Sequence, residues 1–245
     1  MTVSVAFPTF SAAHLAIAAA VPLAAAALTA VARFRRDAAR PIRLALATAI
    51  ALDELAWYAH VVASGGVHPP HGLPLDLCDI VLWLTVWALV APRPWTLEVA
   101  YFLGLAGSGI ALVTPDVGAE LESYAGAKFF LAHGGVVAAI LYLVWTGALR
   151  PRPGAWWRVF LYVNAYAAGV ALFDARFGTN YMYLREKPES GTLLDLLGPW
   201  PWYIVAAEPV ALLLLWSLAL PFRRSARANA VRARELGGVG AHSRR

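Results

Sequence analysis

Seven stretches of apolar residues, each close to the length that crosses a bilayer, constrain this chain more than any other feature. A transmembrane helix needs about 20 consecutive apolar residues. Only 14% of the chain is charged, against roughly 25% in soluble domains. We therefore predict an all-α fold, a polytopic transmembrane helical bundle of about seven spans. The predicted helices cover residues 11–31, 42–63, 73–91, 95–113, 128–149, 156–173 and 202–222.

The fourth stretch is the least apolar, because it holds Gly104, Gly107, Ser108 and Gly109. Small residues let transmembrane helices approach closely. We therefore expect a tightly packed central helix over 95–113. A count of six spans, without this stretch, is the alternative.

The basic residues predict the orientation of the bundle. With seven spans, sixteen of the twenty Lys and Arg residues fall on one side. Cytoplasmic loops carry such an excess, so we predict the N-terminus outside and the C-terminus in the cytoplasm. The expected location is a bacterial inner or plasma membrane. The four on the other side are Lys128, Arg176, Arg185 and Lys187.

The charge also bears on domains and partners. Residues 1–222 form one predicted transmembrane domain, and 223–245 form a basic tail that cannot bury a core and is expected to be disordered. The net charge of +5 comes largely from this tail and short loops. We therefore expect membrane lipids, and no nucleic acid, as partners.

The single cysteine, Cys78, stands between Asp76 and Asp79 near the start of the third stretch. His133 lies as far into the fifth stretch, roughly 8 Å from the same side. A thiol becomes a good nucleophile when a histidine accepts its proton. We predict Cys78 and His133 as a catalytic pair, with Asp79, about 100° around the helix from Cys78, orienting the imidazole. The alternative makes Cys78 a small buried residue and His133 a structural one.

Further polar residues lie inside predicted spans, where each is costly and suggests a function. Asp53, Trp57 and His60 share one helical face, and Glu208 precedes Pro209. We expect Asp53, Trp57 and His60 to form a structural hydrogen-bonded network, with a relay or a contact to a substrate headgroup as the alternative. Glu208 is expected to be structural, with a second acid/base or a partner for Arg176 as the alternatives. In a transporter, these residues would bind a proton or substrate.

A metal site on His68 and His71, with Cys78 and His133 as further ligands, is another possible use of these side chains. A catalytic zinc ion normally has three protein ligands, and the His68–His71 spacing is not helical. We predict no metal and no cofactor.

The segment 174–201, between the last two stretches, is long and rich in aromatic residues. Such loops are often functional. We expect residues 180–203 to fold over the outer mouth of the bundle, with a short helix beginning at Thr192 and ending at Gly198-Pro199. Arg176, Arg185 and Lys187 would lie near a lipid phosphate. The candidate substrate-binding residues are Asp76, Arg176, Asn180, Tyr181, Lys187 and Trp202.

Several motifs within residues 70–205 resemble those of the YwaF-like bacterial integral membrane proteins. They are Leu73-Pro-Leu-Asp-Leu-Cys, Tyr101-Phe-Leu-Gly-Leu-Ala-Gly, Thr114-Pro-Asp, Phe130-Leu-Ala-His, Asn180-Tyr-Met-Tyr-Leu-Arg-Glu-Lys-Pro and Leu197-Gly-Pro-Trp-Pro-Trp-Tyr. That family is similar to a eukaryotic multi-span acyltransferase that remodels ether phospholipids. More distantly, it resembles the androgen-induced-protein hydrolases of fatty acid esters.

The resemblance implies a membrane-embedded lipid acyltransferase, with Cys78 carrying the acyl group and His133 as its base. A lipid or fatty acid ester hydrolase is the first alternative, since water can replace the acyl acceptor. A transporter or a non-catalytic membrane binding protein is the second.

Overall fold

The computed structural model describes residues 8–115, 121–188 and 193–242, and every regular element in these ranges is a helix. This confirms the predicted all-α class. The helices are α1 Ala12–Phe34, α2 Ala39–Ala63, α3 Leu77–Val90, α4 Pro94–Ala106, α5 Ser108–Val113, α6 Tyr124–Trp145, α7 Ala155–Phe177 and α8 Trp202–His242, with the short 3-10 helices η1 Arg36–Ala38, η2 Tyr181–Tyr183 and η3 Leu193–Leu197.

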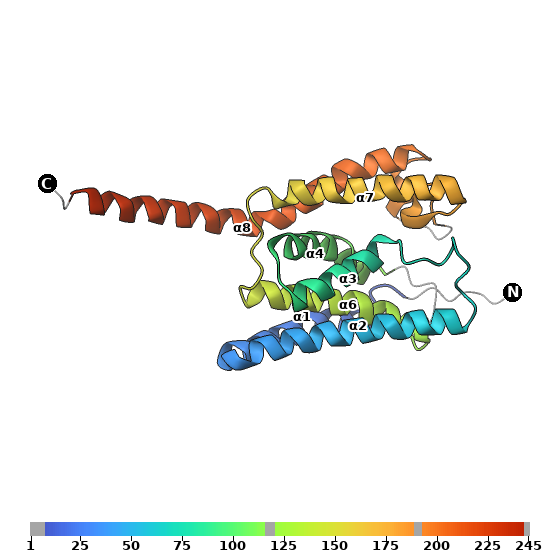
Figure 1. Ribbon diagram of the computed structural model, residues 1–245, viewed down its shortest axis with the longest axis horizontal. Helices are drawn as coiled ribbons and strands as arrows, with labels where there is room; N and C mark the ends of the chain where they lie inside the picture. The colour runs from blue at the N-terminus through green and yellow to red at the C-terminus, as the bar shows by residue number, and fades with distance from the viewer. Residues whose placement is uncertain (1–7, 116–120, 189–192, 243–245) are drawn as a thin grey trace.

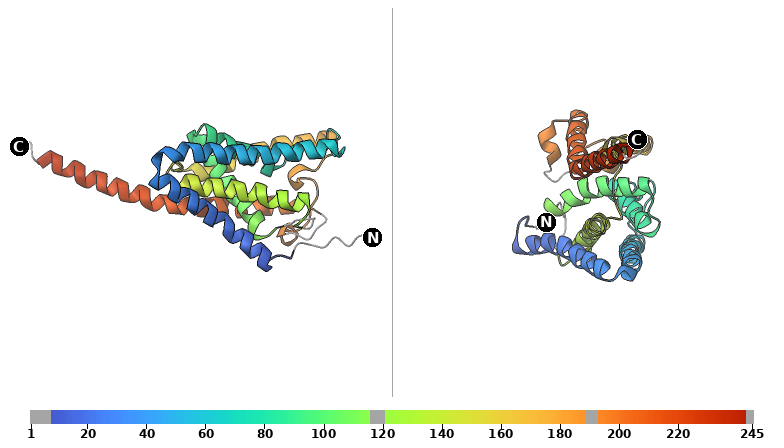
Figure 2. Two further views of the ribbon diagram at one scale, coloured as in Figure 1. Left: turned by 90° about the horizontal axis from the view of Figure 1, so that it is seen from below. Right: turned by 90° about the vertical axis from the view of Figure 1, so that its left-hand side faces the viewer.

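The long helices run side by side along the longest axis of the molecule (Figure 1). The end-on view in Figure 2 places α6 inside a ring formed by α1 to α4, and α6 contacts each helix from α1 to α5. The α7–α8 pair packs against the outside of α4. We call the end of the bundle that carries η2 and η3 the loop end, and the opposite end, from which α8 projects, the arginine end (Figure 1).

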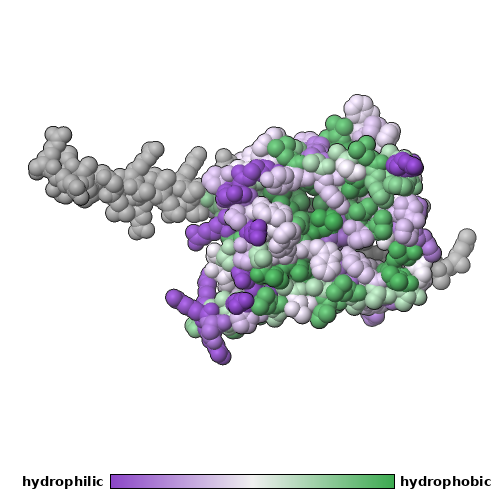
Figure 3. All heavy atoms as spheres, in the orientation of Figure 1, coloured by the Kyte–Doolittle hydropathy of each residue, from purple (hydrophilic) through white to green (hydrophobic). Residues whose placement is uncertain are grey.

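In the described part of the chain, five helical segments are long and apolar enough to cross a membrane: Ala12–Phe34, Arg36–Ala63, Pro94–Val113, Tyr124–Trp145 and Trp202–Phe222. Helix α3 is apolar but only 14 residues long, and α7 has the length, 23 residues, with a less apolar sequence. The chain is thus a multi-pass membrane protein in character. Hydrophilic residues gather at the arginine end of the visible face (Figure 3). Seven crossings and the orientation stay predictions.

The stretch with four small residues is tightly packed, as the sequence predicts, but the central helix of the ring is α6. The stretch divides at Gly107 into α4 and α5, and every residue from Glu98 to Gly104 is buried. A β-carbon on Gly104 would lie 2.3 Å from Ile140 Cδ1, 3.1 Å from Val136 Cγ1 and 3.6 Å from Val81 Cγ1. Only glycine lets α3 and α6 approach α4 this closely.

Two helix starts differ from the predicted ones, in opposite directions. Helix α3 begins at Leu77 rather than 73, because Asp76 at its N-cap is extended, with ψ 150°. Helix α6 begins at Tyr124 rather than 128, because the Ser123 side chain accepts a hydrogen bond from the backbone N–H of Gly126 and caps an earlier turn.

Two other predictions concern the ends of the last loop and helix. Residues after 222, expected as a tail, continue α8 as helix to His242 (Figure 1); the division of the chain at 223 stays a prediction. The short helix expected near Thr192 is present as η3 over Leu193–Leu197. Thr192 itself lies outside the described residues, as does Asp116 of the Thr114-Pro-Asp motif.

Candidate functional site

Tyr181 ties the last loop to the segment that leads into α3. Its hydroxyl donates to the carbonyl of Pro70 and accepts from the backbone N–H of Leu73, both at 2.8 Å. The Met182 N–H donates to the Asp76 carboxylate at 2.8 Å. These bonds confirm that the start of the 180–203 segment lies on the bundle beside α3 rather than extended in water.

Asp174, at the end of α7, positions Tyr181 and was not singled out from the sequence. Its carboxylate is fully buried. One oxygen accepts from the Thr179 hydroxyl at 2.5 Å and from the Tyr181 N–H at 3.1 Å. An acid at the end of an apolar run, five residues before a threonine, could have indicated such a cap.

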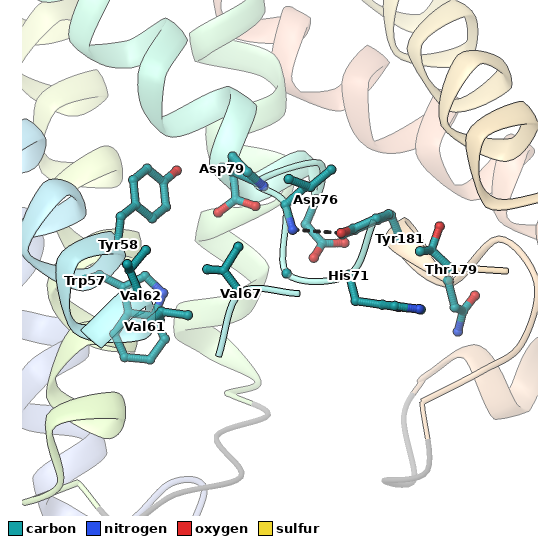
Figure 4. Close-up of a pocket in the computed structure, with 14 residues that line it drawn as sticks. Trp57, Tyr58, Val61, Val62, Val67, His71, Asp76, Asp79, Thr179 and Tyr181 are labelled. Atoms are coloured by element: carbon teal, nitrogen blue, oxygen red, sulfur yellow. Dashed lines mark hydrogen bonds between the residues drawn. The ribbon is translucent and has the colours of Figure 1, made fainter. Parts of the chain in front are cut away.

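A cavity of about 630 Å³ opens at the loop end, between the end of α2, the segment before α3 and η2. Figure 4 shows its lining, in which aromatic and acidic side chains face the same space. The aromatic and titratable side chains of this lining are Trp57, Tyr58, His71, Asp76, Asp79 and Tyr181. Five of the sequence-predicted residues line it: Trp57, Asp76, Asp79, Asn180 and Tyr181.

Cys78 is the second residue of α3, and its side chain is exposed. It shares a helical face with Leu82, Thr85 and Leu89, at spacings of four, seven and eleven residues. Those three residues are buried. Cys78 is therefore the exposed residue at the loop end of the α3 face whose other residues pack inside the bundle.

His133 is held in one ring orientation by its own helix. Its Nδ1 lies 2.7 Å from the carbonyl oxygen of Phe129. A carbonyl only accepts, so Nδ1 carries the proton and Nε2 of the neutral ring is left as a proton acceptor. The sequence predicted Asp79 as the orienting partner; the structure has the Phe129 carbonyl in that place.

Packing at Gly104 shows how Cys78 and His133 lie along the bundle. Val81 and Val136 both contact the position of a β-carbon on Gly104, and both Cys78 and His133 precede these valines by three residues. Helices α3 and α6 run in the same direction from the loop end and touch. The thiol and the imidazole are therefore about one turn, or ~4.5 Å, above a shared packing point. Among the described residues, no hydrogen bond joins them.

Lys128, which the sequence assigned to the loop charges, is buried inside the bundle. Its Nζ lies 2.6 Å from Glu54 Oε2 and 3.1 Å from Asp53 Oδ2. Glu54 is 2% and Lys128 7% exposed. The missed signal was a lysine in an apolar stretch of one helix facing two adjacent acids in another.

The other members of the predicted α2 stripe lie against the start of α6. The rings of Trp57 and His60 contact Tyr124, with centroids 5.7 and 4.8 Å apart. With Asp53 bound to Lys128, the stripe joins α2 to α6.

The remaining candidate residues are not brought to the large cavity. Lys187 pairs with Asp195 at 3.3 Å and lies over the ring of Tyr203, while Arg176 lies over Phe177. Trp202 is exposed at the start of α8. Glu208 accepts a hydrogen bond of 3.0 Å from Asn164 and joins α8 to α7, beside a smaller cavity of about 170 Å³.

Asn180 organises the loop from within. Its side-chain oxygen accepts from the backbone N–H groups of Arg185 and Glu186, at 2.9 and 3.2 Å. Within the described ranges, no group of three or more His, Cys, Asp and Glu side chains is placed to hold a metal ion.

Comparison with known protein families shows which family the chain matches. The sequence model of the TMEM164 family, a family of membrane proteins, matches residues 9–219, which is most of the chain. No curated protein and no solved structure matches the chain.

Proposed function

Since this chain belongs to the TMEM164 family, we propose that it is a membrane-embedded lipid acyltransferase that uses Cys78 as nucleophile and His133 as base. The proposal rests on an exposed thiol on α3 and, on the touching helix α6, an imidazole whose Nε2 is left to accept a proton. Catalytic hydrogen bonds are often loose without substrate and tighten when it binds.

The proposed reaction has two balanced halves. In the first, His133 Nε2 takes the proton of Cys78 Sγ while the sulfur attacks the ester carbonyl of a phospholipid. The ester C–O bond breaks, the leaving oxygen takes the proton from Nε2, and a thioester remains on Cys78. In the second, Nε2 takes the proton of a lysolipid hydroxyl that attacks the thioester. The C–S bond breaks, and the proton returns to sulfur.

Trapping the acyl-enzyme tests the proposal. Purified protein is incubated with a phospholipid that carries an alkyne-tagged acyl chain, and the protein-bound tag is measured before and after hydroxylamine. We expect a hydroxylamine-sensitive label on the wild type and none on Cys78→Ala. His133→Ala should lose most of the label, and part should return at high pH, where the thiolate forms without a base. His68→Ala, an exposed histidine in the segment before α3, is the matched control.

The products separate the remaining alternatives. Added lysolipid should give a new diacyl lipid, whereas release of free fatty acid alone identifies a hydrolase. Full lipid-modifying activity in Cys78→Ala would overturn the mechanism. Absence of any acyl transfer or hydrolysis in the folded wild type would favour a transporter.

A further inference from the structure

The turn from α1 to α2, at the arginine end of the bundle (Figure 1), carries positive charge that the described part of the chain does not neutralise. It holds one acid, Asp37, and five arginines: Arg33, Arg35, Arg36, Arg40 and Arg43. Asp37 lies 3.4 Å from Arg35, with both side chains exposed. A second acid of this end, Glu98, already holds Arg152 and Arg158. The other four arginines of the turn form no ion pair with any residue in the described ranges.

Three of these four arginines share one helical face. Residues Arg36–Ala63 form one continuous helical segment, in which Arg36, Arg40 and Arg43 follow at spacings of four and three residues. Side chains at these spacings are neighbours on a helix, and we call the three residues the arginine stripe. The Nε atom of Arg43 is buried and has no hydrogen-bond partner among the described residues. Because an unsatisfied buried donor is costly, this guanidinium favours an acceptor from outside the chain.

Two helices bring arginines to the last turn of α6. Arg33, near the end of α1, donates from its guanidinium to the carbonyl of Trp145 at 2.7 Å. Tyr142, three residues earlier in α6, donates from its hydroxyl to the carbonyl of Ala39 at 3.0 Å. Arg43 lies one turn after Ala39 on the same face of α2 and interacts electrostatically with that hydroxyl. Arg33 and the arginine stripe therefore converge on one corner between α1, α2 and α6.

Exposed aromatic side chains at the same corner indicate that the ligand is a lipid. Phe34 is 90% exposed, although it directly follows the apolar run of α1. Trp145, whose carbonyl Arg33 holds, is 36% exposed. Aromatic side chains at helix ends suit the boundary between headgroups and acyl chains. Arginine in turn binds a phosphate group through two parallel hydrogen bonds.

We infer that the arginine stripe, together with Arg33, binds the phosphate of an anionic phospholipid at this corner. The turn carries five arginines and one aspartate, and this excess of positive charge repels the choline or ethanolamine group of a zwitterionic lipid. Basic pockets between transmembrane helices are known to bind anionic headgroups. The corner lies at the opposite end of the bundle from Cys78, so the inference does not depend on the proposed reaction.

Lipid binding by the purified protein tests the inference. Native mass spectrometry compares bound phosphatidylglycerol with phosphatidylcholine of identical acyl chains, added in equal amounts. We expect the wild type to prefer phosphatidylglycerol by about tenfold, and Arg43→Gln to bind it about fivefold more weakly. The double variant Arg36→Gln, Arg40→Gln changes two exposed positions, which keeps the test valid if Arg43→Gln does not fold, and should lose more. Arg176→Gln, exposed at the loop end, removes the same charge elsewhere and should leave the preference unchanged.

Inorganic phosphate separates a lipid from a free anion as the ligand. Phosphate should displace no more phosphatidylglycerol than chloride at equal ionic strength, since it makes no contact with Phe34 or Trp145. Stronger displacement by phosphate would mean that the corner takes a free anion, and would overturn the lipid as ligand.

Three results of the lipid comparison would also overturn the inference. The first is equal binding of the two lipids to the wild type. The second is unchanged binding of phosphatidylglycerol to the double variant Arg36→Gln, Arg40→Gln. The third is an equal loss in Arg176→Gln and in the stripe variants, because the lipid would then respond to the net charge of the protein and not to this corner.

Discussion

Lys128 lies in a membrane-length helix and is nonetheless surrounded by protein, since Asp53 and Glu54 hold its ammonium group from α2. Removing one partner of a buried ion pair leaves charge without compensation and costs far more than the pair itself contributes. The cluster therefore fixes how α2 meets α6, the helix that carries His133.

We expect Lys128→Met to destabilise the protein by about 3–5 kcal/mol, because the buried Glu54 and the partly buried Asp53 would be left without a cation. Thermal unfolding in detergent, followed by circular dichroism, measures the loss. Glu54→Gln in the Lys128→Met background should restore part of the stability. Lys187→Met removes a partly exposed pair and should cost about 0–1 kcal/mol. Equal effects of the two lysine variants would contradict this account.

Residue-scale chemistry was only partly predictable from the sequence. Cys78 and His133 stand out because each is an ionisable or reactive group in an apolar stretch. Which group orients His133 does not follow from residue types, because a backbone carbonyl, that of Phe129, takes this place. Lys128 was missed because charge alone does not tell a loop residue from a buried one.

At the scale of helices, Gly104 sets the spacing and register of three elements. Apolar length predicted where the helices are, and glycine content predicted the dense packing of α4. The starts of α3 and α6 depend on local capping, which shifts them in opposite directions. Depth counted from helix ends therefore could not relate Cys78 to His133, whereas the contacts of Val81 and Val136 at Gly104 do.

The Gly104 contact predicts a specific sensitivity. Gly104→Ala adds a methyl group 2.3 Å from Ile140 Cδ1, and such overpacking costs about 1–3 kcal/mol. Unfolding in detergent should show this loss. Gly109→Ala, on the adjoining α5 with nothing within 4 Å of the added carbon, is the matched control and should be neutral. A neutral Gly104→Ala would show that α3 and α6 can separate without cost.

At the scale of the whole molecule, one hydroxyl links the last loop to the segment before α3, and so closes one side of the acidic cavity. Tyr181→Phe removes both bonds of that hydroxyl, at about 1 kcal/mol each. Amide hydrogen exchange near residues 70–76 and 179–186 should become roughly tenfold faster or more. Tyr162→Phe, exposed on α7, should leave exchange unchanged, and unchanged exchange in Tyr181→Phe would rule out the link.

The distribution of charge between the two ends predicts how the molecule sits in the membrane. Segments joining helices at the arginine end hold most of the loop arginines, and arginine-rich loops stay in the cytoplasm. The loop end, with the cavity and Cys78, is then outside.

Single cysteines placed in a Cys78→Ala background test this orientation. Ser64 and Ala148 suit the experiment because both are exposed, at the loop end and the arginine end respectively. A maleimide that does not cross membranes should label Ser64→Cys on intact cells, and should label Ala148→Cys only after permeabilisation. The opposite pattern would mean that the protein has the inverse orientation, with the cavity in the cytoplasmic leaflet.

The same labelling also tests the number of crossings between the two positions. An even number of crossings would place both positions on the same side of the membrane. Three segments lie between these positions: α3, α4 with α5, and α6. When α4 with α5 and α6 each cross, as their length and apolar sequence predict, opposite labelling requires that the short α3 crosses as well.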